Sequence, residues 1–376
     1  MSVAQQIGTI GNSLKVNNLP EASATTYGTG NRFYTLVGTQ DGFKTGHTYK
    51  TVNNDGVYSW TDTEGVPNKL PTLIGVQDAT NSPYEITASD LEGMTKIGDY
   101  AFYRKTGLVG VDLSNITNLG NGVFQNCSGI TEIKADKLTT VGTAAFSGMS
   151  NLKKFSSLTL TKASDNMFSS TPLEEIDCPE LTTIGGSYSM GGSSSKKAFI
   201  GKDLVFPKVT SIAQTAFEHC GARSMSFPSL VSNLQSFTFY QNPNLEEIDL
   251  PLLETAPTSY FVYQCPKVAK LVLPKLTALL FASIYYGNTN LKLIDLPSAT
   301  SLTCYRYQLS GSSIRLKLGY DGVVALNKAS NAVFPTAITE VYVHPNRVEE
   351  YNIATNWVDW VAQGTVTIKS LDDFVE

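Results

Sequence analysis

The sequence predicts a repeat solenoid from about residue 90 onward. A strand phrase of the pattern L-x-x-I-x-L-P recurs, most clearly as LEEIDCP (173–179), LEEIDLP (245–251), VAKLVLP (268–274) and LKLIDLP (291–297). A second phrase, T-x-I-G-x-x-A-F, recurs with it, as in TKIGDYAF (95–102) and TTVGTAAF (139–146). A phenylalanine also returns every 22 residues, at Phe102, Phe124, Phe146 and Phe168 and again from Phe217 to Phe239.

Each repeat supplies one short strand in which apolar and polar residues alternate, as around Ile248 in LEEIDLP. One repeat cannot bury its own apolar face, so neighbouring strands are expected to pair in parallel, about 4.8 Å apart. The phenylalanines are expected to fill the inside of the opposite wall, built from irregular or 3-10 segments. The proline after many strands ends them, since proline cannot donate to the ladder.

Residues 1–70 do not join the repeat. Segments 32–38, 47–52 and 57–62 alternate like strands and are separated by turn sequences, which predicts a small antiparallel meander. We therefore expect four parts: a β-rich attachment module (1–70), a linker and solenoid entry (71–89), the solenoid (90–322) and a C-terminal cap (323–376). The Gly/Ser-rich stretch 185–197 is expected to be a flexible loop at one edge.

The combined phrase closely resembles the BspA-like leucine-rich repeat family of bacterial surface proteins. The resemblance covers about residues 90–322 and implies a leucine-rich repeat solenoid used for adhesion or host-factor binding. Tyr351, Ala354, Trp357 and Trp360 are similar to the C-terminal cap of that family. Physically, a helix with two tryptophans would cover the exposed end of the apolar stack.

Composition excludes several classes of protein. The chain has 376 residues, a net charge of −5 and no Lys/Arg cluster, which argues against nucleic-acid binding. No stretch is long and apolar enough for membrane insertion, and the first residues lack the basic and apolar regions of a secretory signal. With 41% hydrophobic residues, the chain has enough apolar material for a large core.

The sequence offers little material for catalysis, and we expect no enzyme, no cofactor and no metal site. The three histidines lie in unrelated frames, and Cys127, Cys220 and Cys265 share one small slot three places after the phenylalanine column. These thiols are expected to be free and buried. Asp249 and Asp295 lie two repeats apart, about 10 Å by the strand spacing. Inverting glycosidases separate their carboxylates by about 6.5–9.5 Å, but nothing in the sequence marks one carboxyl for a raised pKa, so a solvated polar face is the favoured interpretation of these aspartates.

The candidate binding residues are aromatic. Tyr240, Tyr263 and Tyr286 occupy one frame, 23 residues apart, one place after the phenylalanine column. Such a column can stack on sugars or anchor a protein interface, although some rings can instead replace Phe in the core, as Tyr285 does. Asp249 and Asp295 complete the candidate ligand-binding set.

Residues 30–62 weakly resemble short Gly/Tyr/Trp modules of phage tail-fibre and baseplate proteins. Together with the missing signal, this favours a phage tail-associated receptor-binding protein located in the virion. The alternatives are a secreted bacterial surface adhesin and, less favoured, a polysaccharide-degrading enzyme. The expected partners are a cell-surface glycan or protein receptor and, through the N-terminal module, other tail or baseplate proteins. Whether the chain forms homo-oligomers stays open.

Overall fold

The structure is a computed structural model with two compact units, residues 1–180 and 181–376, and each is described by itself. It describes the backbone of strands 32–37, 49–54, 57–62 and 71–77. It further describes residues 83–88, 91, 94–186, 188–193, 195–257, 260–284, 286–305, 309 and 313–376. The first 31 residues, where an attachment segment was expected, lie outside this part.

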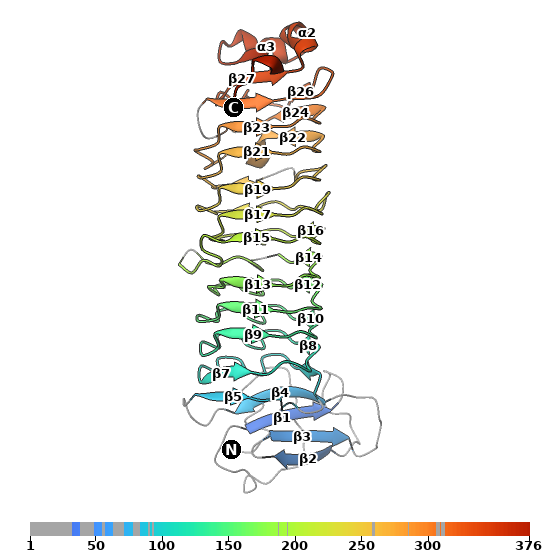
Figure 1. Ribbon diagram of the computed structural model, residues 1–376, viewed down its shortest axis with the longest axis vertical. Coiled ribbons are helices and arrows are strands. Elements are labelled where there is room, and N and C mark those ends of the chain that lie inside the picture. Colours follow the sequence, from blue (N-terminus) through green and yellow to red (C-terminus); the bar gives the residue numbers. More distant parts are fainter. Residues whose placement is uncertain are drawn as a thin grey trace. The chain divides into compact units, whose positions relative to one another are not determined.

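The first unit consists of strands that return at nearly regular intervals. These are β1 (Arg32–Val37), β2 (Tyr49–Asn54), β3 (Val57–Asp62), β4 (Pro71–Gln77), β5 (Tyr84–Ile86), β6 (Lys96–Ile97), β7 (Leu108–Val111), β8 (Asn118–Leu119), β9 (Glu132–Lys134), β10 (Thr140–Val141), β11 (Lys154–Ser156), β12 (Lys162–Ala163) and β13 (Glu175–Asp177). Strands β9, β11 and β13 pair in parallel as one sheet (Figure 1). Strands β6, β8 and β10 also pair in parallel, as part of a seven-stranded sheet with the order β10-β8-β6-β4-β1-β3-β2.

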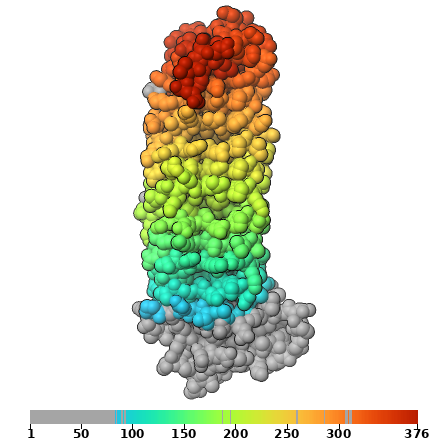
Figure 2. All heavy atoms as spheres, in the orientation of Figure 1, coloured from blue at the N-terminus to red at the C-terminus, as the bar shows by residue number. Residues whose placement is uncertain are grey.

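The second unit repeats this pattern. Its strands are β14 (Thr183–Ile184), β15 (Asp203–Val205), β16 (Ser211–Ile212), β17 (Ser224–Ser226), β18 (Phe239–Tyr240), β19 (Glu247–Asp249), β20 (Val262–Tyr263), β21 (Lys270–Val272), β22 (Ala278–Leu280), β23 (Leu293–Asp295), β24 (Ser301–Cys304), β25 (Ile314–Lys317), β26 (Ala325–Lys328), β27 (Ile338–Val343) and β28 (Thr367–Ser370), with 3-10 turn η2 at Phe281–Ile284. Strands β21, β23, β25, β27 and β28 form one parallel sheet. Within each unit, successive parts of the sequence form successive bands (Figure 2).

The predicted parallel-strand solenoid is therefore confirmed. The wall opposite the L-x-x-I-x-L-P strands is more regular than expected, because the T-x-I-G phrase forms two-residue strands such as β8 and β10. Its glycine is needed for close approach between neighbouring turns. A Cβ on Gly142 would lie 2.4 Å from the carbonyl carbon of Gly120, and only glycine leaves room for that backbone contact.

The meander expected near the N-terminus is wrong in its connectivity. Strands β2 and β3 pair antiparallel as expected, but β1 pairs parallel with β3 and antiparallel with β4. Strand β2 runs opposite to both β1 and β3, so β1 and β3 run in the same direction. Because β1 and β3 lie next to each other in the order β4-β1-β3-β2, they pair in parallel.

The phenylalanine column fills the core as predicted. Phe102, Phe124, Phe146 and Phe168 are fully buried, and successive rings stack with centroids 5.0, 5.8 and 5.5 Å apart. In the second unit Phe217 and Phe239 continue the motif at 6.1 Å. Within each unit, each ring covers the next, so the column there is an apolar stack and not a set of independent cores.

The slot three places after the phenylalanine column is polar in function at several turns. Five of its occupants donate to the carbonyl of the column residue one turn earlier, and we call them the donor ladder: Cys127 to Phe102, Thr171 to Phe146, Asn242 to Phe217, Cys265 to Phe239 and Asn288 to Val262. The expectation of free, buried thiols is confirmed for Cys127, Cys220 and Cys265. On these five turns the slot supplies the donor that a buried carbonyl needs, whereas the apolar Met149 fills it after Phe146.

The C-terminal end of the second unit carries two short helices, α2 (Val348–Ile353) and α3 (Trp357–Ala362), preceded by the 3-10 turn η3 (Pro345–Arg347) and followed, after β28, by η4 (Leu371–Asp373). Trp357 and Trp360 are fully buried and stack on each other at 5.5 Å. Trp357 Nε1 donates to the Val324 carbonyl at 2.7 Å, and the Tyr351 hydroxyl accepts from the Val324 amide at 2.9 Å. The predicted capping role of these residues thus has a direct structural basis.

Within the described residues, no helix is both long and apolar enough to pass through a lipid bilayer.

Candidate functional site

The outward strand positions lie in the register that the sequence predicts. In the second unit Val205, Ser226 and Asp249 are neighbours on β15, β17 and β19, and Val272, Asp295 and Lys317 are neighbours on β21, β23 and β25. Asp249 accepts a hydrogen bond from Ser226 Oγ at 2.6 Å. Asp295 instead forms an ion pair with Lys317 at 3.0 Å. The two candidate carboxylates therefore have different partners.

The outward column is not uniformly exposed, which corrects the solvent-facing assignment at its C-terminal end. Phe374, in the tail after β28, packs edge-on against Tyr342 at 4.9 Å and lies 5.2 Å from the Lys317 ammonium. As a result Tyr342 is only 4% exposed, and the Asp295 side chain only 15%. The repeat pattern could not show this, because the tail that covers these positions is not part of a repeat.

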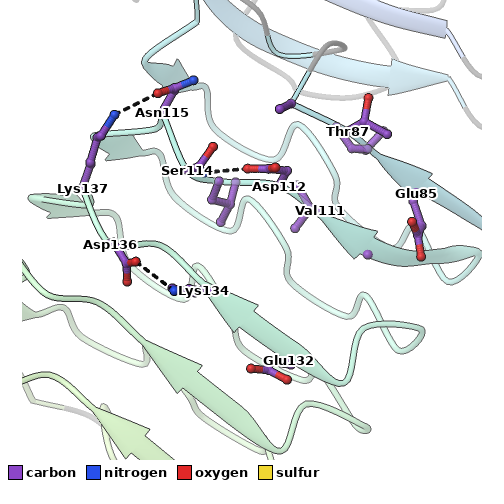
Figure 3. Close-up of a pocket in the computed structure, with 14 residues that line it drawn as sticks. Glu85, Thr87, Val111, Asp112, Ser114, Asn115, Glu132, Lys134, Asp136 and Lys137 are labelled. Atoms are coloured by element: carbon purple, nitrogen blue, oxygen red, sulfur yellow. Dashed lines mark hydrogen bonds and ion pairs between the residues drawn. The ribbon is translucent and has the colours of Figure 1, made fainter.

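The first unit has a hollow of about 770 Å³ along β5, β7 and β9 (Figure 3). Lys134 pairs with Asp136 at 3.2 Å, and Lys137 donates to the Asn115 side chain at 2.9 Å. Hydrogen bonds from Ser114 hold the pKa of Asp112 below its usual value. Two further charged residues that line the hollow, Glu85 and Glu132, are exposed. This arrangement is typical of a solvated polar face.

The predicted tyrosine column is present in the second unit. The rings of Tyr240 and Tyr263 lie 5.1 Å apart, and those of Tyr263 and Tyr286 lie 5.5 Å apart. Tyr240 and Tyr263 are half-buried, whereas Tyr286 is 48% exposed. Phe237 and Tyr260 widen the cluster, with ring centroids 5.0 Å apart. The result is a contiguous aromatic surface; Tyr285 and Tyr307 lie outside the described residues.

The structure does not bring the candidate aspartates to this aromatic surface. Asp249 and Asp295 belong to β19 and β23, whereas Tyr240 and Tyr263 belong to the separate two-stranded sheet of β18 and β20. Asp249 lines a different hollow, together with Arg223, Lys270 and Val272. The five candidate residues therefore form at least two separate surfaces.

A carboxylate that the sequence analysis missed lies at the start of the tyrosine column. Glu218 follows Phe217 as Tyr240 follows Phe239, so it has the same frame one turn earlier. It is only 7% exposed and accepts a hydrogen bond from the Tyr188 hydroxyl at 3.1 Å. Burial raises its pKa, and the hydrogen bond only partly opposes this shift. A search for acidic residues in the tyrosine frame would have found it.

Two aromatic rings cover this carboxylate. Tyr188 stacks with His219 at a centroid distance of 6.4 Å, and Met190, two residues after Tyr188, is 1% exposed. Burial, and then the charge of Lys197, lowers the pKa of His219, so its ring is neutral near pH 7. Residues 188–190 therefore belong to the packed wall, and the expectation of a flexible loop fails for them because Met190 fills a core position.

Replacing Glu218 with Gln is expected to leave the melting temperature at pH 7 unchanged or to raise it. A carboxyl whose pKa is raised in the folded protein destabilises the fold once it is ionised. The free energy of unfolding begins to fall as pH rises through the pKa of the unfolded chain, about 4.3, and this loss is complete above the pKa in the folded protein. The amide keeps an acceptor for Tyr188 without that cost. Melting curves across this pH range, with exposed Glu247→Gln as control, check this expectation. A lower melting temperature for Glu218→Gln at neutral pH would contradict it.

No three His, Cys, Asp or Glu side chains gather as metal ligands anywhere in the described part of the chain. Burial raises the pKa of all five thiols to about 12. Among the described residues, the candidate functional groups are thus those of the aromatic surface and the buried carboxylate of Glu218 beside it.

Stacked parallel turns with a leucine, isoleucine and phenylalanine core define a leucine-rich solenoid protein. The family model described as the BspA type leucine rich repeat region (6 copies) matches residues 84–196 and 195–314. The chain belongs to this family.

No curated protein matches the chain. Among solved structures it is similar to a leucine rich cell surface protein from Faecalibacterium prausnitzii A2-165, with 14% identity and a TM-score of 0.35 over 75% of this chain and 95% of that one. It is also similar to a leucine-rich repeat protein from Bacteroides ovatus ATCC 8483, with 13% identity and a TM-score of 0.37 over 86% and 98%. The pneumococcal vaccine antigen PcpA gives 15% identity and a TM-score of 0.33 over 87% and 97%.

Proposed function

We propose that the protein is a non-enzymatic adhesion or recognition protein that binds a cell-surface glycan or protein through the tyrosine column. The observation that carries this proposal is the contiguous aromatic surface of Tyr240, Tyr263 and Tyr286. A monomer gains nothing in its core from a ring as exposed as Tyr286, whereas aromatic rings presented in a row are effective binding anchors.

Substituting Tyr240, Tyr263 and Tyr286 together with Ala is expected to reduce binding to host cells by roughly tenfold or more, since each aromatic contact contributes about 0.5–1.5 kcal/mol. Flow cytometry with labelled protein measures the loss, and circular dichroism checks that the fold is retained. The matched control replaces Tyr100, Tyr103 and Tyr320, which lie outside the column. Unchanged cell binding by the column variant would rule out this surface.

Two different parts of the chain support two different locations for the protein, the bacterial cell surface and the phage virion. Membership of the BspA type family supports a bacterial surface adhesin located outside the cell. The phage-tail placement, with tail or baseplate partners, depends on the resemblance of residues 30–62 alone. An antibody against the solenoid distinguishes them: labelling of intact bacteria supports the adhesin, and labelling of purified virions supports the tail protein.

A polysaccharide-degrading activity has weaker support. Asp249 and Asp295 lie in separate sheets, on β19 and β23, and Asp295 is paired with Lys317. An inverting hydrolase needs one carboxyl raised in pKa as the acid and another free to act as the base. Incubation with host capsule and sizing of the products tests this alternative, and shortened chains would support it over simple binding.

A further inference from the structure

A shallow groove of about 540 Å³ runs beside the tyrosine column in the second unit. Its wall includes the residues that directly follow the column frame on successive turns: His219, Gln241, Gln264 and Gly287. Tyr286 belongs to both the column and the groove. The groove therefore combines an exposed aromatic ring with a row of neutral polar groups.

Gln264 has an unmet hydrogen-bonding capacity. Its side-chain Oε1 is buried, and no residue of the described part of the chain donates to it. A buried acceptor without a partner costs about 1–3 kcal/mol, which a donor supplied by a ligand would recover. The backbone of Gly287 packs directly against this side chain, since a Cβ built on Gly287 would lie 2.7 Å from Gln264 Cγ.

The charges at the end of the groove are balanced. Lys197 lies in the wall, and its charge lowers the pKa of His219. The buried Glu218 lies 3.8 Å from His219 on the same turn. One cation and one carboxylate thus flank a neutral imidazole, so the groove provides no excess charge to attract an ionic ligand.

We propose that this groove binds an uncharged glycan, with a sugar ring against Tyr286 and the Gln264 side chain turning its amide oxygen, which is buried in the free protein, toward a sugar hydroxyl that donates to it. A pyranose offers both requirements at once, an apolar ring face for the tyrosine and hydroxyl donors around its edge. The amide of Gln241 and the imidazole of His219 accept or donate further along the same wall. This inference rests on the proposed function and names the ligand class of that surface.

The test uses the full-length protein and an array of short gluco-, manno-, galacto- and N-acetylglucosamine oligomers, with a polyuronate and a sialylated oligomer as the charged set. We expect binding within the neutral set. Gln264→Leu is expected to weaken it roughly fivefold, the effect of one neutral hydrogen bond, and Tyr286→Ala to weaken it as well. Exposed Gln235→Leu, outside the groove, is the matched control and should bind as the wild type does.

Stability separates a binding role from a structural one. Because Leu removes an acceptor that is already unsatisfied, Gln264→Leu is expected to melt at the wild-type temperature or above. Weaker glycan binding with unchanged melting supports the proposal. Binding of charged glycans only, wild-type affinity in Gln264→Leu, or no glycan binding at all overturns it. If host-cell binding still depends on the tyrosine column in those cases, the adhesion function stands with another ligand or another mode of glycan binding; if it does not, that function fails separately.

Discussion

Removal of residues 346–376 is expected to destabilise the second unit more than any single substitution does. The deletion takes away Trp357, Trp360 and Tyr351, all fully buried, and also β28, which pairs with β27. Since truncating one buried tryptophan costs about 3–5 kcal/mol, the combined loss should exceed about 5 kcal/mol. Calorimetry of the full chain and the shortened one measures the difference.

A finer variant is Trp357→Ala, which removes the ring and the hydrogen bond to the Val324 carbonyl. Its matched control is Val358→Ala, the next residue in α3 and 42% exposed. We expect the tryptophan variant to melt far below the valine variant. An unchanged melting temperature after the deletion would mean that the last turn of the solenoid needs no cover.

Asn288→Ala is expected to be the most damaging single change within the repeats. Asn288 is 1% exposed, and its Nδ2 donates to the carbonyls of Val262 and Ile284 at 3.0 and 2.9 Å. Its Oδ1 accepts from the Cys265 amide at 3.0 Å. Alanine leaves these three backbone groups without partners, and each unmet bond costs about 1–3 kcal/mol.

We expect a total loss of about 3 kcal/mol or more, which lowers the melting temperature by roughly 6–12 °C in a unit of this size. The exposed neighbour Asn290 provides the control, because Asn290→Ala should stay within about 0.5 kcal/mol of the wild type. Equal melting of the two alanine variants would show that the donor ladder contributes nothing to stability.

The repeat frame made the solenoid predictable. A fixed spacing determines which residues become neighbours, so the phenylalanine column and the register of Asp249 with Ser226 followed from counting. The tyrosine column followed in the same way. These are contacts between equivalent positions, and periodicity encodes such contacts directly.

What the sequence did not predict falls into two physical kinds. The donor ladder uses Cys, Thr and Asn interchangeably, so its rule is a shared hydrogen bond and not a shared residue type. The cover over Tyr342 comes from the tail at Phe374, and the wall over Glu218 comes from Tyr188. Each of these two covers is a contact between a repeat and a segment outside the repeat frame, and the repeat period alone cannot reveal such a contact.

The ladder cysteines also determine how the protein responds to oxidants. Thiol exchange requires the thiolate, and with a pKa of about 12 Cys127 and Cys265 stay protonated at neutral pH. Their protons are directed at the carbonyls of Phe102 and Phe239. In the ladder, sulfur therefore serves as a hydrogen-bond donor, and these buried, protonated thiols are expected to react only slowly with oxidants.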